Sequence, residues 1–462
     1  MKAQAETTAT VEGPVEGGKH GWPFAASLRD VAALGYEEVE YFLAGTAKRY
    51  RDVNDSMSRR DGYWEAEEAG QAEFRTRMLV YRPRDPARFN GTVILNWNNV
   101  TAGYDLFGAE SLELFEGGFA VVFLTTQKVG IEGLPPVRQG LAHWDPERYG
   151  TLFIPSDDYA YDVFTQAALA VGPDRDRDPD PLGGLNVQRV IGWGASQSAG
   201  RLATYLNAIQ PLTQALDGCI LAIYFGRGTP LEVGDTVVNI NERPAGATQN
   251  QLVGSNLIRD DLDIPVFVVN SELEAMACYR VRQPDTDTFR YWEAAGTCHV
   301  SQQVQHTRET LQERDGLKGR PMDPDVNAVP MGLLYDAVFH HMQRWMAEGI
   351  APPVQPKIEF AGEPPQIVRD EHGIATGGIR LPQVEVPLAT NSAIPRGEGI
   401  FALLGGSCEP FPADKVRALY GDEAAFLAQF EAAAQRAMEA QVLRPRDVPL
   451  LVEEARGLWP GQ

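Results

Sequence analysis

The chain has 462 residues, of which 44% are hydrophobic and 23% charged, a composition typical of a folded globular protein. Its formal net charge of −22 argues against binding to nucleic acid or to anionic lipid, because both require a basic face. No run of about 18 apolar residues exists, so the sequence predicts no membrane-spanning helix. An acidic surface repels anions, so a neutral small molecule is the expected ligand. Composition says nothing of the oligomeric state.

Residues 1–18 are polar and small, which predicts no signal peptide and a cytoplasmic location. A secreted mature form whose signal has been removed is the alternative. The four cysteines, Cys219, Cys278, Cys298 and Cys408, have no CxxC spacing, which argues against a zinc ribbon or a redox motif. We expect buried thiols. The alternative is a disulfide between Cys278 and Cys298, since both follow neighbouring predicted strands.

Short apolar runs bounded by turn residues recur along the chain and predict strands. They cover residues 74–81, 92–97, 119–124, 187–193, 219–225, 265–270 and 289–294. Apolar residues at helical spacing predict helices over 27–34, 159–171, 197–210 and 332–347. Apolar strands that alternate with helices indicate the α/β class, with a mostly parallel central sheet and helices on both faces.

Two segments depart from this alternation. Residues 226–263 are polar and Gly-rich and precede a predicted strand, which is typical of a cap-like insertion. The composition changes again at residue 351, where a proline-rich stretch begins. The sequence thus predicts an α/β core over residues 1–350 and a C-terminal extension over 351–462 that packs on the core. Two helices are expected within the extension, over 413–419 and 422–440.

Residues 192–200 read GWGASQSAG and lie between a predicted strand and a predicted helix. This setting is typical of a nucleophile elbow, G-x-S-x-G, in which a serine on a sharp turn projects from the carboxyl edge of a sheet. Ser196 is then the nucleophile, and Gly194 lets the backbone close up. Ser198 replaces the usual second glycine but is still small. The alternative is a turn that binds phosphate, but Gln197 stands where the Rossmann fingerprint needs its third glycine.

Polar residues after the last two predicted strands follow the order serine, acid, histidine that is typical of α/β-hydrolases. Glu272 and Glu274 come after the first of these strands, and His299 comes after the second. His299 is the predicted general base, which takes the proton of Ser196 and later returns it to the leaving group. Glu274 is the predicted acid, because the chain should have turned inward by that residue. Glu272 is the alternative acid.

Two backbone N–H groups should hold the oxyanion of such a site. The first is predicted to be that of Gln197, at the start of the helix after the serine. The second is predicted to come from Asn98 or Asn99, after the second predicted strand; a turn without this role is the alternative. No histidine forms an HExxH pair, so the sequence predicts neither a metal nor a cofactor. His340 and His341 are expected to pack within their helix.

At these residues the sequence resembles a bacterial family of large α/β-hydrolase domain proteins. The matching segments are GYEEVEYFLAGTAKRY, GASQSAGRLATYLN, PVFVVNSELEA, FRYWEAAGTCH, TGGIRLPQVEVP and LYGDEAAFLAQF. They span nearly the whole chain, including the extension. The resemblance implies an esterase-like fold and activity, and it implies that Ser198 is a normal residue at its position.

The sequence therefore predicts a serine carboxylic-ester hydrolase that acts through an acyl-enzyme on a neutral small-molecule ester. Ser196 attacks, His299 transfers the proton and Glu274 orients the imidazole. One alternative is a lactonase, amidase or acyltransferase with the same three residues. A further alternative, from another class, is a non-catalytic binding protein on the same scaffold.

Overall fold

The computed structural model describes residues 9–106, 111–234, 255–319 and 325–460. The chain forms two compact units, one of Met1–Val266 with Leu311–Lys318 and one of Phe267–Thr310 with Gly319–Gln462. The predicted boundary at residue 351 stays a prediction. Residues 235–254 of the predicted insertion lie outside the described residues.

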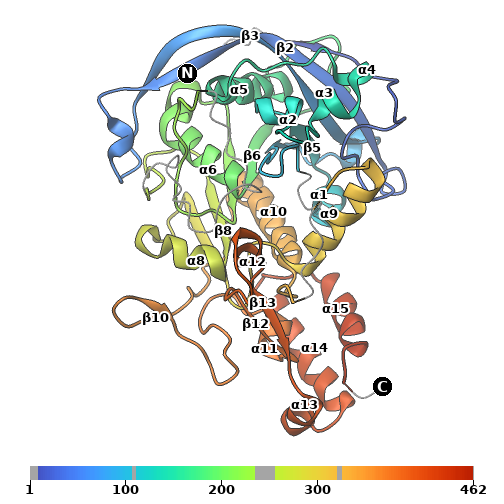
Figure 1. Cartoon of the computed structure of the whole chain (residues 1–462), viewed down its shortest axis with the longest axis vertical. Coiled ribbons are helices and arrows are strands. Elements are labelled where there is room, and N and C mark those ends of the chain that lie inside the picture. Colours follow the sequence, from blue (N-terminus) through green and yellow to red (C-terminus); the bar gives the residue numbers. More distant parts are fainter. Residues whose placement is uncertain (1–8, 107–110, 235–254, 320–324, 461–462) are drawn as a thin grey trace. The chain divides into compact units, whose positions relative to one another are not determined.

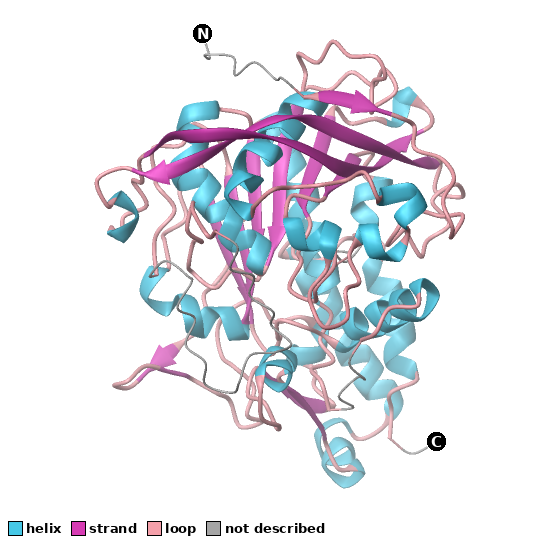
Figure 2. Ribbon diagram, turned by 45° about the horizontal axis from the view of Figure 1, so that its top comes forward, coloured by secondary structure: helices cyan, strands magenta, loops and turns pink. Residues whose placement is uncertain are grey.

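The sheet of the first unit has the strand order β1-β2-β3-β5-β4-β6-β7. Its strands are β1 (Thr10–Glu12), β2 (Tyr36–Asp52), β3 (Ala66–Pro83), β4 (Thr92–Trp97), β5 (Ala120–Leu124), β6 (Arg189–Ala195) and β7 (Gly218–Ala222). β5, β4, β6 and β7 pair in parallel, and β1, β2 and β3 pair antiparallel at the other edge. The long β2–β3 pair crosses the first unit as a twisted ribbon (Figures 1 and 2).

The parallel strands β4, β5 and β7 are buried over their whole length. This burial explains their continuous apolar sequences, because a parallel sheet is covered on both faces. Helix α5 (Ala160–Val171) packs against β2 and β4, and helix α6 (Gln197–Thr204) packs against β6 and β7. The fold is therefore of the α/β class with a mostly parallel central sheet, as predicted.

The helix predicted over residues 197–210 consists of three joined pieces. α6 continues through a π-helical turn (Tyr205–Ile209) into α7 (Gln210–Thr213). Pro211 has no backbone N–H, so it cannot donate to the carbonyl of Asn207 four residues earlier. That carbonyl accepts a hydrogen bond from Arg259 Nη1 at 2.9 Å instead. The proline thus removes one α-helical hydrogen bond from this irregular turn, and Arg259 donates to the carbonyl concerned.

The first unit also contains several short helices. They are α1 (Leu112–Glu116), α2 (Lys128–Glu132), α3 (Leu141–Trp144) and α4 (Pro146–Tyr149), with single 3-10 turns at Ser56–Ser58, Pro86–Arg88 and Asp157–Tyr159. The helix predicted over residues 27–34 is wrong, because this segment forms turns. Tyr36 N donates to Val31 O at 2.9 Å, and Gly35 adopts a φ of +81° that reverses the chain into β2.

The second unit begins with β8 (Val266–Ser271) and α8 (Glu272–Cys278), followed by β9 (Phe289–Ala294), the neighbour of β8. α9 (Gln302–Asp315) comes next, with its residues from Leu311 onward counted in the first unit, and α10 (Met331–Glu348) follows. The remaining elements are β10 (Phe360–Ala361), β11 (Gln366–Ile367), α11 (Pro382–Glu385), β12 (Ala389–Ser392), α12 (Ile400–Gly405), β13 (Ser407–Pro410), α13 (Ala413–Tyr420), α14 (Glu423–Glu439) and α15 (Asp447–Arg456).

Residues after 351 pack on β9 within this second unit. Trp292 Nε1 donates to Pro353 O at 2.9 Å. Ala295 N donates to Ile379 O, also at 2.9 Å, and Ala294 forms a parallel bridge with Ile379. The C-terminal residues and the strands that precede the predicted acid and base therefore share one compact unit.

The alternative prediction of a disulfide between Cys278 and Cys298 is wrong, because all four cysteines are thiols. Cys298 Sγ donates to Leu404 O at 2.9 Å, whereas Cys278 Sγ accepts from Asn270 Nδ2 at 3.5 Å. The two sulfurs thus have different neighbours although both follow neighbouring strands. Burial raises the pKa of both thiols, so both stay protonated at neutral pH.

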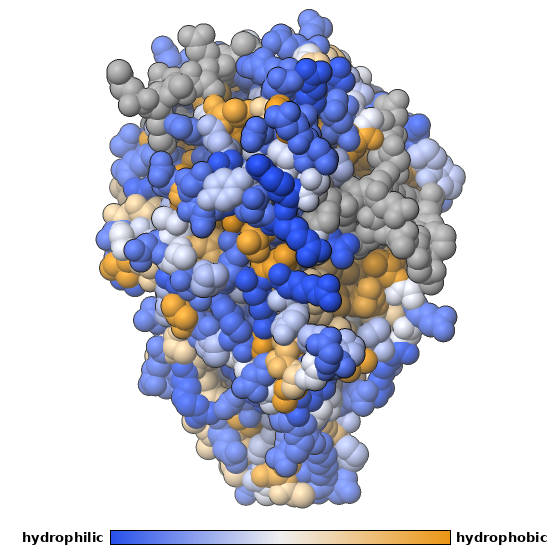
Figure 3. All heavy atoms as spheres, turned by 90° about the vertical axis from the view of Figure 1, so that its left-hand side faces the viewer, coloured by the Kyte–Doolittle hydropathy of each residue, from blue (hydrophilic) through white to orange (hydrophobic). Residues whose placement is uncertain are grey.

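The face of the molecule seen in Figure 3 is mostly hydrophilic, and its apolar residues lie in scattered groups. This distribution agrees with the low mean hydropathy of −0.26. Among the described residues, no helix is both long enough and apolar enough to cross a membrane.

His341 joins α10 to the C-terminal residues of the second unit. Its Nε2 donates to Gln441 O at 2.8 Å, and its ring packs edge-on against Trp292 with centroids 5.6 Å apart. Burial lowers the pKa of His341 to about 4, so the imidazole is neutral in the folded protein at neutral pH. The packing role predicted for this histidine is confirmed.

We predict that His341 makes the protein less stable in acid. Its pKa is about 4 when folded and 6.5 unperturbed, so the unfolded state binds the proton more readily. The contribution of the neutral His341 to stability is therefore fully present above pH 6.5. It is lost as the pH drops towards 4, which lowers the free energy of unfolding by about 3 kcal/mol over this window. Urea unfolding across the window should show a shallower pH dependence for His341→Gln. His340→Gln, on the same helix, is the control and should keep the wild-type slope; equal slopes in all three proteins would contradict the prediction.

Candidate active site

The strand order of the first unit reverses at β4, which has β5 on one side and β6 on the other. In open α/β sheets, ligands bind beyond the carboxyl ends of the strands at such a switch point. Asn98 and Asn99 follow β4, and Ser196 follows β6. Asn99 Nδ2 donates to Ala195 O at 3.1 Å and so ties the two strand ends together. The predicted nucleophile therefore lies where the topology favours a ligand site.

Ser196 has a backbone conformation that few residues other than glycine adopt. Its φ is +63° and its ψ is −118°, and α6 begins at the next residue. Ser196 N donates to Ala222 O at 2.9 Å, which fixes the end of β6 against β7. Strain of this kind costs about 1–3 kcal/mol and persists where the surrounding structure enforces it. A strained serine between a strand and a helix has the geometry of a nucleophile elbow.

Gly194 is necessary for the tightness of this turn. A Cβ atom at Gly194 would lie 2.9 Å from both C and O of Ser198, and 2.8 Å from Leu202 Cδ1. Two of these three atoms belong to backbone that cannot move without distorting α6. Ser198 itself is fully buried, and its hydroxyl has no hydrogen-bond partner among the described residues. The small side chain at Ser198 thus packs in the turn without a hydrogen bond to the described residues.

The loop after β4 excludes Asn98, one of the two residues predicted to supply the second oxyanion donor. Asn98 N donates to Leu124 O at 3.1 Å, so this N–H extends the sheet and is not available to a ligand. The prediction for Asn98 is therefore wrong, and Asn99 stays as the predicted loop donor. Gln197 occupies the first position of α6, where a backbone N–H has no partner within the helix.

The Asn98 side chain has a different role from the predicted one. Asn98 Nδ2 donates to Asp105 Oδ2 at 3.0 Å, and Asn98 Oδ1 accepts from Asn96 Nδ2 at 2.7 Å. The Thr125 hydroxyl donates to the same oxygen of Asp105. Burial raises the pKa of Asp105. This buried polar chain holds the loop after β4 in place, so Asn98 shapes the loop through its side chain.

A second polar network, which the sequence did not reveal, holds the Gln197 side chain. Gln197 Nε2 donates to Gln127 Oε1 at 2.9 Å, and Trp97 Nε1 donates to the same oxygen at 3.2 Å. Gln127 Nε2 donates to Asp157 Oδ2 at 2.7 Å, and Arg201 Nη2 pairs with that carboxylate at 3.2 Å. The network joins the ends of β4 and β5 to the first turns of α6. Only the place of Gln127, three residues after β5, could have suggested it.

The second unit brings the predicted base and acid together. His299 Nδ1 lies 2.7 Å from Glu274 Oε1, and both side chains are buried. Because a carboxylate only accepts hydrogen bonds, Nδ1 carries the proton in this pair. The other ring nitrogen, Nε2, is then the basic one. This is the tautomer that a general base needs.

Ser271 fixes the Glu274 carboxylate from the opposite side. The hydroxyl and the backbone N–H of Ser271 both donate to Glu274 Oε2, the latter at 3.2 Å. Ser271 Oγ in turn accepts from Leu273 N at 3.2 Å, which completes a capping box at the start of α8. Ser271 was not among the predicted site residues, although the pattern S-x-x-E is the known sequence signal of this cap.

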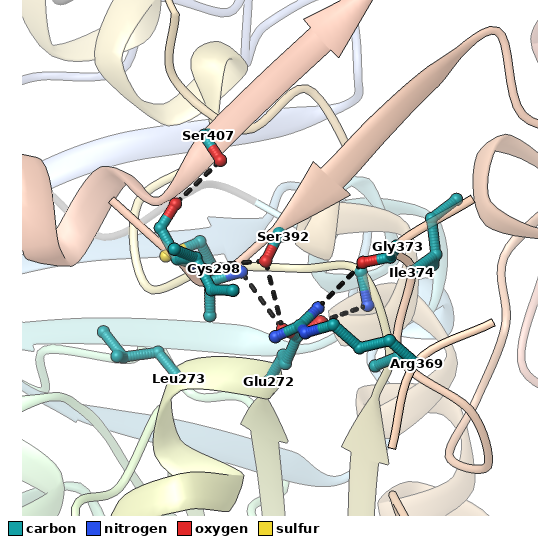
Figure 4. Close-up of polar contacts among 12 residues, drawn as sticks. Glu272, Leu273, Cys298, Arg369, Gly373, Ile374, Ser392 and Ser407 are labelled. Atoms are coloured by element: carbon teal, nitrogen blue, oxygen red, sulfur yellow. Dashed lines mark hydrogen bonds and ion pairs between the residues drawn. The ribbon is translucent and has the colours of Figure 1, made fainter. Parts of the chain in front are cut away.

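Glu272 and Glu274, the alternative and the predicted acid, both lie in a helix. Both belong to the first turn of α8, and residues two apart in a helix point in nearly opposite directions. Glu272 accepts from Gly296 N at 2.9 Å. It also pairs with Arg369 Nη2 at 2.6 Å, as Figure 4 shows. The alternative acid is therefore engaged by other groups.

The predicted site residues thus fall into two sets. Ser196, Gln197 and Asn99 belong to the first compact unit, and Glu274 and His299 belong to the second. Among the described residues, no three His, Cys, Asp or Glu side chains are grouped so as to hold a metal ion.

The chain belongs to the alpha/beta hydrolase domain family, whose model matches residues 11–453. No curated protein of known function matches the chain. The match covers the strand–serine–helix segment, the acid and base loops and most of the C-terminal residues. The predicted fold class and the predicted family are therefore confirmed.

Three solved structures illustrate the more distant similarities. A brefeldin A esterase, described as a bacterial homologue of human hormone-sensitive lipase, is 12% identical, with 46% of this chain and 52% of that chain covered and a TM-score of 0.22. Esterase Est22 is 12% identical, with 59% of this chain and 80% of that chain covered and a TM-score of 0.27. An arylesterase is 15% identical, with 58% of this chain and 82% of that chain covered and a TM-score of 0.29. The chain thus spans about half the length of the first of these. With such low scores, the family assignment rests on the family model.

We predict that Gly194→Ala destabilises the protein, because the new methyl group would meet the backbone of Ser198. Overpacking of this kind typically costs about 1–3 kcal/mol. Gly332→Ala is a matched control, since a Cβ at Gly332 meets nothing within 4 Å and α10 already contains this residue. Alanine favours a helix over glycine, so the control should be neutral or slightly more stable. Denaturant unfolding of both variants is the measurement, and equal midpoints would contradict the prediction.

Proposed function

We propose that the protein is a serine hydrolase that cleaves a carboxylic ester through an acyl-enzyme, with Ser196 as nucleophile, His299 as base and Glu274 as acid. The observation that carries the proposal is the strained backbone of Ser196, with φ at +63° between β6 and α6. A family of hydrolases and a buried His299–Glu274 pair at 2.7 Å support it.

In the proposed reaction, Ser196 Oγ attacks the carbonyl carbon of the ester while His299 Nε2 takes the hydroxyl proton. The Glu274 carboxylate stabilises the imidazolium that forms. The backbone N–H groups of Gln197 and Asn99 would hold the negative charge on the former carbonyl oxygen. The tetrahedral intermediate collapses, and the proton on His299 passes to the departing alcohol. A water molecule, activated by the same imidazole, then hydrolyses the acyl-enzyme and regenerates Ser196.

The proposed substrate is a neutral small-molecule ester. The formal charge of −22 disfavours anionic substrates through long-range repulsion. A panel of p-nitrophenyl esters of graded acyl length, with a lactone and an anilide included, would define the class of substrate. Turnover of the lactone or anilide in preference to every ester would redefine the reaction while keeping the same three residues.

We predict that Ser196→Ala abolishes ester turnover, with a loss on the order of 10⁶ in kcat by analogy with other serine nucleophiles. A fluorophosphonate probe should label the wild-type protein and fail to label this variant. Ser198→Ala is the matched control, because Ser198 lies in the same turn and its buried hydroxyl has no partner in the part of the chain that the structure describes. If Ser196→Ala keeps substantial activity, or if the wild-type protein resists the probe, the proposed nucleophile is wrong.

We predict that Glu274→Gln lowers kcat by roughly 10³ or more, because an amide in place of the carboxylate favours the wrong imidazole tautomer. Glu272→Gln should cost about tenfold or less, since Glu272 contacts Gly296 and Arg369 instead of the base. Steady-state kinetics of both variants on one activated ester test the assignment. A larger loss for Glu272→Gln would reverse the choice of acid without affecting Ser196 or His299.

A further inference from the structure

Glu272 is a second buried carboxylate beside the acid–base pair, and its side chain is fully buried. One carboxylate oxygen accepts from Gly296 N at 2.9 Å. The other pairs with Arg369 Nη2 at 2.6 Å and accepts from Ala393 N at 3.2 Å. Figure 4 shows Glu272 at the centre of these contacts, with Ser392 and Arg369 converging on it. One side chain thus joins α8 to three other segments of the second unit.

The contact with Gly296 links Glu272 to the loop that carries His299. Gly296 lies two residues after the end of β9, has a φ of +66° and leaves no room for a side chain, because a Cβ would lie 2.8 Å from Val384. Glu272 N also donates to Thr297 Oγ1 at 3.3 Å. Glu272 therefore fixes this loop at two consecutive residues, through both its backbone and its carboxylate.

Arg369 is held in position by its own segment. Arg369 Nη1 donates to Gly373 O at 3.1 Å. The turn between them is closed by Asp370 Oδ1, which accepts from His372 N at 2.9 Å and from Ile374 N at 3.0 Å. The guanidinium is therefore directed at Glu272 by a turn with internal hydrogen bonds, not by an isolated flexible side chain.

The negative charge of Glu272 acts on Cys298, the residue next to the base. Burial is the main cause of the raised pKa of the Cys298 thiol, and the negative charges of Glu274 and Glu272 raise it further. A buried carboxylate without a counter-charge is strongly unfavourable, so the pairing with Arg369 matters to the whole region. Removing Arg369 would leave two negative charges in the first turn of α8, both acting on the His299 loop.

We infer that the Glu272–Arg369 ion pair is a positioning device for the base: Glu272 holds the loop that carries His299, and Arg369 neutralises Glu272 so that His299 responds to Glu274 alone. This inference rests on the proposed role of His299 as general base. Arg369 touches neither the substrate nor the reacting atoms in this scheme. It acts through Glu272, and its effect on the reaction is therefore electrostatic.

Other titratable groups around the pair have to be considered for the pH dependence. α8 contributes Glu274 itself, and the loop contributes the Cys298 thiol. Tyr335 of α10 has its pKa raised by burial and then by the Glu274 charge, while the charge of Arg308 on α9 lowers it. The raised pKa values of the thiol and the phenol keep both neutral in the range where a histidine titrates. Changes at Glu272 and Arg369 are therefore expected to alter the pH dependence of the base.

The test is the rising limb of the kcat/KM–pH profile, which reports the base in the free enzyme. Arg369→Met leaves Glu272 without its counter-charge, which favours the imidazolium, so the limb should move to higher pH by about half a unit or more. Glu272→Gln leaves the positive charge of Arg369 unpaired instead. This charge disfavours the imidazolium, so the rising limb should move to lower pH. The double variant Glu272→Gln with Arg369→Met carries neither charge, so its limb should return towards the wild-type position.

Arg396→Met is the matched control, because Arg396 pairs with Glu409 at the surface of the same unit, where ion pairs contribute little. Its profile should equal that of the wild type. A purely structural role for Arg369 would lower activity without moving the limb, and that result would overturn the inference, as would shifts of both single variants in the same direction. If Arg369→Met does not fold, the acid shift of Glu272→Gln and its reversal in the double variant carry the test. Failure of the proposed function is recognised separately, by an active Ser196→Ala variant.

Discussion

The carboxylate of Glu274 is the group on which the proposed acid–base pair of the second unit depends. One of its oxygens accepts from Ser271 and the other from His299, so neither is left unsatisfied in a buried setting. The same interaction that caps α8 therefore also orients the imidazole. A helix terminus is a rigid place for a carboxylate, because the serine that begins the helix and the acid three residues later constrain each other.

In the first unit, the geometry of the serine depends on the parallel pairing of β4, β6 and β7. Because these strands end at the same edge, the loops after them are brought together without any sequence similarity between them. The strain at Ser196 is maintained by contacts on both sides, namely the hydrogen bond to Ala222 and the close packing of Gly194 on the next turn. A stable sheet thus maintains one unfavourable backbone conformation at the site.

The sequence predicted correctly those strands whose limits depend on neighbouring residues alone. The strands at 92–97 and 289–294 have the predicted bounds because each is a short segment that is buried over its whole length. The inward turn expected at Glu274 is made by a capped helix, α8, which was not predicted from the sequence. The failure at Asn98 has another origin: whether a backbone N–H bonds to a neighbouring strand is a tertiary property. The ion pair of Glu272 joins residues 97 positions apart, a separation that no spacing rule detects.

The partners of Glu272 also impose an order of events during synthesis. Residue 369 leaves the ribosome 97 residues after residue 272, and Ala393 follows later still. At typical elongation rates, this delay is about 5–20 s. During that interval the acid and base loops exist without the guanidinium and the backbone amide that neutralise and hold Glu272. Docking of the late C-terminal segment is then the step that completes the surroundings of the proposed acid–base pair, so a nascent or shortened chain would contain every proposed catalytic residue and still lack these contacts.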